Sequence, residues 1–185
     1  MQRLEPSTTA LLVVDLQDRL APAMEPVAFA RAVKATDLLL SAAHMLGVAT
    51  IATEQYPKGL GATIDALLGP LELVGAPRVA KTTFCAVEAP EVARFLSARS
   101  PRAVVVVGVE AHVCVFQTVR DLCARGYEVH VPHDAVASRR DDDRRAALAL
   151  MRRAGAIVTT SETLVFDWLV RAEGEAFKAL SKKMR

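Results

Sequence analysis

Short apolar runs alternate with helix-like segments along almost the whole of this 185-residue chain. This alternation limits the number of possible folds more than any other feature of the sequence. Short apolar runs bounded by turn signals are typical of buried strands, whereas an apolar face that recurs every three to four residues indicates a helix. Strands and helices that alternate in this way build a parallel sheet with helices on both faces. The sequence therefore predicts a three-layer α/β fold, and the length suits a single domain over residues 1–185.

Six segments are expected to be strands, and they cover residues 10–14, 48–53, 79–81, 103–107, 127–131 and 156–159. Helices are expected over residues 27–46, 63–68, 91–98 and 111–125, after Ser138, and beyond residue 159, with residues 70–77 as a loop. Ser138 is expected to cap the helix that ends at Gly155. Acidic residues open that helix and basic residues close it, as the helix dipole favours.

Composition excludes several classes of protein. The 23 basic and 21 acidic residues leave a net charge of +2, which offers no electrostatic argument for nucleic acid. No apolar stretch approaches the ~20 residues of a membrane span, and Asp15 interrupts the first apolar run, so neither a membrane partner nor a signal peptide is expected. Three cysteines argue against a disulfide framework and favour a reducing compartment, so we expect a cytoplasmic protein.

Polar residues close three of the expected strands. Asp15 and Lys81 end two of them, and Cys114 follows the third by a few residues. In an open parallel sheet, ligands bind beyond the carboxyl ends of the strands, so these three residues are candidates for a common site. Each also has a simpler explanation: Asp15 as a turn or cap residue, Lys81 as a surface lysine, and Cys114 as a buried packing residue.

Cys114 lies where a central strand gives way to a helix. The helix N-terminus and Lys81 favour a thiolate there, so we expect the Cys114 pKa to lie below the ordinary value of about 8.5. A cysteine hydrolase needs a thiolate, a proton carrier and donors for the oxyanion. Asp15 can carry the proton, Lys81 can stabilise both anions, and backbone N–H groups near Cys114 can bind the oxyanion. This scheme requires no histidine base.

Three runs, at residues 12–17 (LVVDLQ), 81–84 (KTTF) and 108–115 (GVEAHVCV), resemble those of the isochorismatase-like cysteine hydrolases. Residues 53–57 (TEQYP) and 161–162 (SE) are similar to the small isochorismatase domain-containing branch. The resemblance implies a six-stranded parallel sheet. It also implies that Asp15 is the base, Lys81 the charge partner and Cys114 the nucleophile.

The resemblance further implies a cis peptide bond between Val109 and Glu110, and an oxyanion hole made by the backbone N–H groups of Glu110 and Cys114. Nicotinamidases in this superfamily bind a metal through an Asp-x-His pair, but Glu54 and Tyr56 occupy that place here. We therefore expect no metal and no cofactor. Isochorismatases themselves lack the nucleophilic cysteine, so Cys114 argues against isochorismate as the substrate.

The expected function is that of a cysteine hydrolase that cleaves a carbon–nitrogen bond of a small amide-type substrate through a thioester at Cys114. Gln17, Glu54, Phe84 and His112 are expected to line the substrate pocket.

Two alternatives remain open at this stage. The chain can be a catalytically silent family member that binds a metabolite or serves as an assembly subunit. It can also be a thiol-based redox protein, although Cys123 is poorly placed as a resolving cysteine. A homo-oligomer is expected, because the Ala- and Leu-rich helix over residues 27–46 leaves apolar surface beyond what a sheet face covers.

Overall fold

The computed structural model describes residues 2–184. Its strands are β1 (Thr9–Val14), β2 (Ala49–Gln55), β3 (Arg78–Lys81), β4 (Ala103–Gly108), β5 (Glu128–Pro132) and β6 (Ile157–Thr159). They form one parallel sheet in the order β3-β2-β1-β4-β5-β6, which confirms the expected six-stranded α/β fold.

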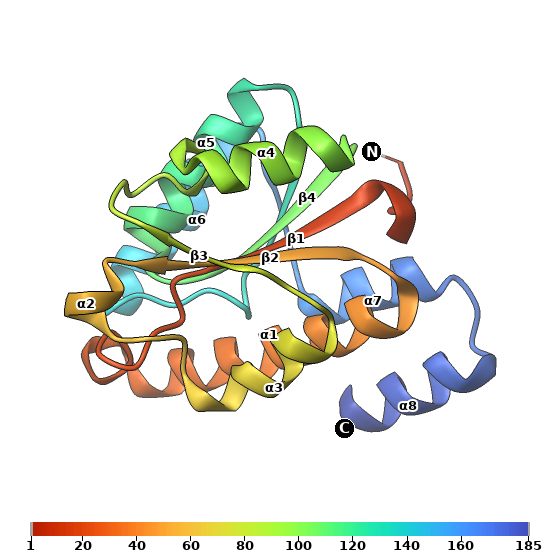
Figure 1. Cartoon of the computed structure of the whole chain (residues 1–185). Coiled ribbons are helices and arrows are strands. Elements are labelled where there is room, and N and C mark those ends of the chain that lie inside the picture. Colours follow the sequence, from red (N-terminus) through yellow and green to blue (C-terminus); the bar gives the residue numbers. More distant parts are fainter. Residues whose placement is uncertain (1, 185) are drawn as a thin grey trace.

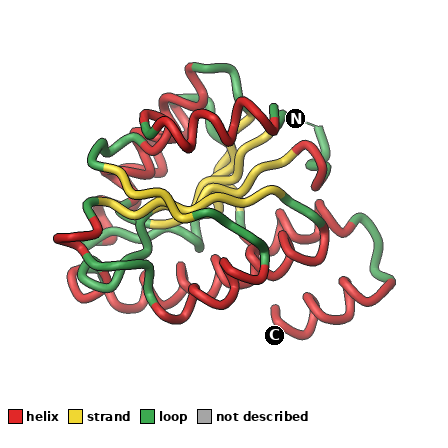
Figure 2. The backbone as a smooth tube through the Cα atoms, viewed as in Figure 1, coloured by secondary structure: helices red, strands yellow, loops and turns green. Residues whose placement is uncertain are grey.

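Helices cover both faces of this sheet, as Figures 1 and 2 show. One face carries α4 (Pro90–Arg99), α5 (Phe116–Ala124) and α6 (Asp141–Arg153). The other carries α1 (Pro26–Leu46), α3 (Asp65–Leu73), α7 (Ser161–Leu169) and α8 (Gly174–Met184). Short helices α2 (Pro57–Leu60), η1 (Pro6–Thr8), η2 (Ala21–Ala23) and η3 (Ala86–Glu88) lie in the connections, and η4 (Ala111–Val115) is one turn of π-helix before α5.

The central strands β1 and β4 are buried along their whole length. Their side chains alternate between the two faces: Leu11 and Val13 pack against the α1 side, whereas Leu12 and Val14 pack against the α5 side. Continuous apolar runs are what a strand covered on both faces requires. The two cores therefore follow directly from the sequence of these strands.

The close approach of β1 and β4 places the start of η4 beside the end of β1. Gly108 pairs with Val14 and has a φ of +119°. A Cβ at position 108 would lie 2.0 Å from the Val14 carbonyl oxygen, so only glycine fits there. Val109 N–H then donates to that same oxygen at 2.9 Å.

Residues 70–77, expected to form a loop, are partly helical, because α3 continues to Leu73 with Pro70 inside it. Leu67 and Leu71 are fully buried, and α3 packs against α1. Burial of two leucines contributes about 1.5–3 kcal/mol each, which offsets the roughly 3 kcal/mol that a proline costs inside a helix.

Ser138 does not cap α6, contrary to expectation. Arg140 precedes this helix, and no side chain there caps it. Ser138 is instead buried, and its hydroxyl lies 3.0 Å from His112 Nδ1. Its carbonyl accepts a hydrogen bond from Glu25 N–H, just before α1. Tertiary contacts therefore fix the position of Ser138, which the local sequence pattern predicted to be a helix cap.

Helix α1 leaves little spare apolar surface, contrary to expectation. This helix packs against α3, α7 and α8. Its strongly exposed large apolar side chains are Val27 and Met45, near its two ends. None of the helices in residues 2–184 combines the length and apolar character that a bilayer span requires.

Candidate active site

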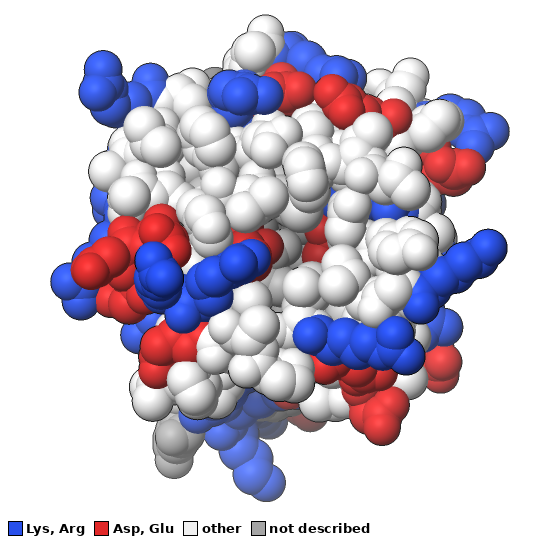
Figure 3. Space-filling view, turned by 90° about the vertical axis from the view of Figure 1, so that its left-hand side faces the viewer, with Lys and Arg blue, Asp and Glu red and all other residues white. Residues whose placement is uncertain are grey.

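The three predicted site residues all lie at the carboxyl edge of the sheet. Asp15 follows β1, Lys81 ends β3, and Cys114 lies in η4 after β4. Figure 3 views the molecule from this edge, with charged side chains around the rim and a largely uncharged centre. Acidic atoms are visible in the hollow at that centre.

Asp15 and Lys81 form a buried ion pair. Lys81 Nζ lies 2.7 Å from Asp15 Oδ2, and the two side chains are 1% and 0% exposed. The ammonium also donates to Gln55 Oε1 at 2.6 Å and to the Thr83 carbonyl at 3.2 Å. An ammonium has three protons, so these acceptors satisfy it and fix Lys81 as a positive charge beside Asp15.

Thr53 and Gln55 orient this pair, and the sequence analysis missed both. The Thr53 hydroxyl donates to Asp15 Oδ1 at 2.7 Å, and the Gln55 side chain, which accepts from Lys81, donates to the Thr82 carbonyl at 2.9 Å. A signal was present: residues two apart on a strand share a face, and both lie at the end of β2 between the strands that lead to Asp15 and Lys81.

The Cys114 thiol is buried, and burial, followed by the negative charge of Asp15, raises its pKa to about 12. Lys81 acts in the opposite direction and is outweighed. The expected lowering of the Cys114 pKa is therefore wrong. Desolvation favours the neutral thiol, and it arises from the tertiary burial of Cys114. Both side chains nevertheless act directly on the thiol, so the three predicted residues are neighbours.

The helix that carries Cys114 is joined to the segment that follows β3. The Cys114 carbonyl accepts from the Thr118 hydroxyl at 2.7 Å, and that hydroxyl accepts from Ala86 N–H at 2.8 Å. Lys81 meanwhile holds the carbonyls of Thr83 and Phe84. The connection from β3 to η3 is thus bound at one end by the Lys81 ammonium and at the other by the helical segment that carries Cys114.

A free backbone donor lies four residues before Cys114 in the chain. Within residues 2–184, the Glu110 N–H donates no hydrogen bond, whereas the N–H groups of Val109 and Ala111 donate to Val14 and Ala137. The peptide bond between Val109 and Glu110 is cis. Cys114 lies in the first turn of the helical segment, where backbone N–H groups have no intrahelical acceptor in regular helices.

Two of the four residues expected to line a pocket have structural roles instead. Gln17 is fully buried, and its side-chain amide bonds the backbone of Gln55 and Gly61. Glu54 accepts from the backbone N–H and the hydroxyl of Thr63. Since neighbouring strand residues alternate in direction, Glu54 lies on the opposite face of β2 from Gln55 and from the ion pair.

The other two expected pocket residues lie closer to Lys81 and Cys114. Phe84 has an exposed ring, and its carbonyl accepts from Lys81 Nζ at 3.4 Å. His112 lies two residues before Cys114, half-buried, with its Nδ1 beside the Ser138 hydroxyl.

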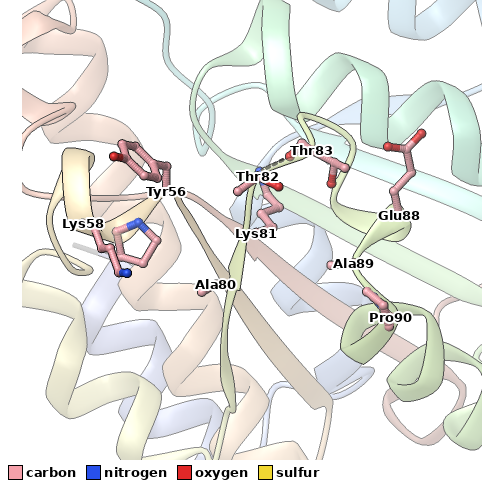
Figure 4. A pocket seen from close by; sticks show the side chains of 10 residues that line it. Tyr56, Lys58, Ala80, Lys81, Thr82, Thr83, Glu88, Ala89 and Pro90 are labelled. Atoms are coloured by element: carbon pink, nitrogen blue, oxygen red, sulfur yellow. Dashed lines mark hydrogen bonds between the residues drawn. The ribbon is translucent and has the colours of Figure 1, made fainter.

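A cavity of about 450 Å³ lies on the outer side of β3. Figure 4 shows Tyr56 and Lys58 on one side of it and Thr83 and Glu88 on the other. Lys81 also lines this cavity, but Asp15 and Cys114 do not. Within residues 2–184, no group of three or more His, Cys, Asp or Glu side chains is arranged to hold a metal ion.

Comparison with known proteins identifies the family of this chain. The model of the Isochorismatase domain matches residues 9–163. The chain is 38% identical to "Isochorismatase domain-containing protein 1" of Danio rerio, covering 96% of this chain and 61% of that protein. It thus spans less than two thirds of the length of that relative.

"Isochorismatase domain-containing protein 2" of Bos taurus is 37% identical over 99% of this chain and 86% of that protein. The solved structure "MAR1 Ribonuclease from Caenorhabditis elegans" has a TM-score of 0.89 and 38% identity, covering 99% of this chain and 92% of that one. The buried Asp15–Lys81 pair beside Cys114 is therefore found in a chain that belongs to the isochorismatase family, in its isochorismatase domain-containing branch.

Proposed function

We propose that this chain is a cysteine hydrolase that cleaves a carbon–nitrogen bond of a small amide-type substrate. The observation that carries the proposal is the buried Asp15–Lys81 pair next to the Cys114 thiol. A free N–H at Glu110 lies nearby on the same edge of the sheet. Together these groups provide a nucleophile, a proton acceptor, a fixed charge and an oxyanion donor, which acyl transfer requires.

In the first half-reaction, Cys114 Sγ attacks the amide carbon while Asp15 takes the thiol proton. With a pKa of about 12, only about one thiol in 10⁵ is ionised at pH 7, so proton transfer to Asp15 accompanies the attack. The C–S bond forms and the carbonyl π electrons move to oxygen. The backbone N–H groups of Glu110 and Cys114 stabilise this oxyanion. When it collapses, the C–N bond breaks and the leaving nitrogen takes the proton from Asp15.

In the second half-reaction, water attacks the thioester while Asp15 takes one of its protons. The C–S bond then breaks, the sulfur regains the proton, and a carboxylic acid leaves. The net reaction is amide plus water to acid plus amine. Lys81 stabilises the carboxylate of Asp15 from a fixed position, because Gln55 and the carbonyls of Thr83 and Phe84 also accept from its ammonium.

This scheme assigns no task to a metal or cofactor. We also propose a reducing, cytoplasmic setting, which suits three free cysteines. A homo-oligomer remains part of the proposal, now because Tyr56 and Phe84 expose aromatic surface close to the ends of β2 and β3. Light scattering at micromolar concentration should give a mass above that of one 19.9 kDa chain, and a monomer would contradict it.

The experiment that tests the function is a screen of small amides, read by release of ammonia or amine. We expect turnover with at least one compound, and none with the Cys114→Ala variant. Cys85→Ala is the matched control, since Cys85 is also a buried, free thiol but is bonded to Asp121 instead of the Asp15–Lys81 pair.

Two outcomes would contradict the proposal. Turnover that survives Cys114→Ala would assign the chemistry elsewhere. A chain that binds amides without ever acylating Cys114 would be the silent, metabolite-binding alternative. RNA belongs in the same screen because of the name of the C. elegans structure. Cleavage of RNA without any amide turnover would replace the proposed substrate class.

A further inference from the structure

The Glu110 side chain makes an ion pair that the proposed reaction does not use. Its carboxylate is 6% exposed, and it accepts from Arg139 Nη2 at 2.6 Å and from Arg139 Nε at 3.0 Å. The Arg139 backbone N–H donates to the same carboxylate at 3.1 Å. Arg139 itself remains 57% exposed. The largely exposed guanidinium of Arg139 thus binds the buried carboxylate of Glu110, the residue whose backbone N–H is free.

The rest of the segment that contains Arg139 lies along the chain from Gly108 to His112. Gly108 N–H donates to Ala135 O at 2.9 Å, and Ala111 N–H donates to Ala137 O at 2.8 Å. These bonds fix the peptides on either side of Glu110 but do not involve its own N–H. The Glu110 side chain is therefore held by a distant part of the chain, through its ion pair with Arg139.

We propose that Arg139 is a positioning residue, which holds the Glu110 backbone N–H toward the developing oxyanion by gripping the Glu110 carboxylate with two parallel hydrogen bonds. The inference rests on the proposed hydrolase function. Arg139 touches neither the substrate nor the thiol in this account, and it acts only through Glu110. A planar guanidinium suits this task because its fork matches a carboxylate in one orientation, whereas a lysine ammonium does not.

The charges around the pair are consistent with this role. Burial by itself raises the Glu110 pKa, but the hydrogen bonds and charge of Arg139 outweigh it, so that the pKa lies below its ordinary value. His112 on η4 acts in the same direction, and Asp143 on α6 faces Arg139. Without the Arg139 side chain, the buried carboxylate loses its charged partner and both guanidinium hydrogen bonds, and it keeps only the bond from the backbone N–H of residue 139.

Two probes of Cys114 separate this role from general structural damage. With p-nitrophenyl acetate, a C–S bond forms, the C–O bond to p-nitrophenolate breaks, and an oxyanion develops on the acetyl group. With iodoacetamide, a C–S bond forms as iodide leaves, and no oxyanion develops. In both reactions the thiol proton is finally released to solvent. Only the acylation therefore depends on the oxyanion hole.

Arg139→Ala should lower the acylation rate at least about tenfold and leave alkylation within about twofold, since loss of one oxyanion donor costs roughly 10²–10³ in rate. Arg140→Ala, the neighbouring exposed arginine outside any ion pair in residues 2–184, should change neither rate. The acylation rate of Arg139→Lys should lie between those of Arg139→Ala and Arg140→Ala. With an amide substrate, Arg139→Ala should lower kcat with little change in KM. Millimolar guanidinium should restore part of the acylation rate in Arg139→Ala and in no other variant.

Three results would overturn the inference. Equal acylation by the wild type and Arg139→Ala would show that Glu110 needs no outside support. A raised KM at unchanged kcat would assign Arg139 to substrate binding. Equal loss of acylation and alkylation would mean general damage to the site. If the wild-type Cys114 reacts with iodoacetamide but never with the ester, the proposed hydrolase function fails as well, so the two failures are distinguishable.

Discussion

Two charged clusters lie at opposite edges of the same sheet and differ mainly in their access to water. At the carboxyl edge, Asp15 and Lys81 are at most 1% exposed. At the amino edge, Arg102 Nη1 pairs with Glu128 Oε2 at 2.7 Å, with side chains 32% and 24% exposed, and His130 Nε2 lies 2.9 Å from the other Glu128 oxygen. Both clusters have ion-pair geometry of similar quality, so geometry alone does not distinguish them.

The difference lies in what surrounds each pair. The amino-edge cluster keeps part of its hydration and joins strand ends to the N-terminal segment, where Arg102 also donates to the Arg3 carbonyl. The carboxyl-edge pair is hydrogen-bonded to fixed protein groups in place of water, and its two charges shift the pKa of the Cys114 thiol. A dry, fully bonded ion pair beside a thiol supports the proposed catalytic role of the carboxyl edge, whereas a partly hydrated pair is typical of a surface salt bridge.

The largest difference between the clusters should appear when one cation is removed from each. Lys81→Met leaves the Asp15 carboxylate buried without its partner, which should cost about 3–5 kcal/mol of unfolding free energy and abolish activity. Arg102→Met should cost about 0–1 kcal/mol, because water can replace the lost partner. Urea denaturation followed by circular dichroism measures both values. Equal losses of unfolding free energy would contradict the proposed difference between the two clusters.

The pH dependence of Cys114 alkylation tests whether the thiol at the carboxyl edge is desolvated. Burial and Asp15 hold the thiol pKa at about 12, so its thiolate fraction should rise about tenfold per pH unit across pH 6–10. Iodoacetamide labelling of Cys114, resolved by peptide mass spectrometry, should follow that rise without a plateau. An inflection between pH 6 and 8 would instead indicate the lowered pKa that the helix N-terminus alone predicts.

A smaller effect should follow from removing one hydrogen bond to Asp15. Thr53→Val deletes the donor to Oδ1, which should cost about 1–3 kcal/mol and lower kcat because the carboxylate loses its orientation. Thr50→Val is the matched control, a buried threonine on the same strand whose hydroxyl bonds the Val48 carbonyl. Equal loss of kcat in the two variants would show that Thr53 supports the strand and not the site.

A chelator is expected to have no effect on activity. The amino-edge cluster contains a histidine and a carboxylate, and the carboxyl edge contains a carboxylate and a thiol, yet neither has a role for a metal in the proposed reaction. Dialysis against EDTA should leave kcat unchanged within about twofold. Loss of activity that zinc or iron restores would contradict the proposed mechanism.

Much of the fold could be predicted from the sequence because its signals are local. The apolar runs of β1 and β4 are long enough to require burial on both faces, and parallel strands bring Asp15 and Lys81 to one edge. The continuation of α3 through Pro70 could not be predicted, because packing against α1 outweighs the local preference.

The environment of the site could not be predicted in the same way. The helix N-terminus near Cys114 is visible in the sequence, but the burial that raises the thiol pKa arises only when distant segments close over it. Arg139 and Glu110 are 29 residues apart, and no local pattern indicates that they meet. Thr53 and Gln55 were within reach, because their spacing of two on a strand places them on one face.

The most direct test of the central claim is to trap the acyl-enzyme. The wild-type chain, mixed with a turned-over amide and quenched in acid, should carry the acyl mass on the Cys114 peptide, and hydroxylamine should remove it as a thioester. Cys114→Ala should carry no adduct, and Cys85→Ala should behave as the wild type. Turnover without any adduct on Cys114, or an adduct that maps to Cys85 or Cys123, would contradict the account.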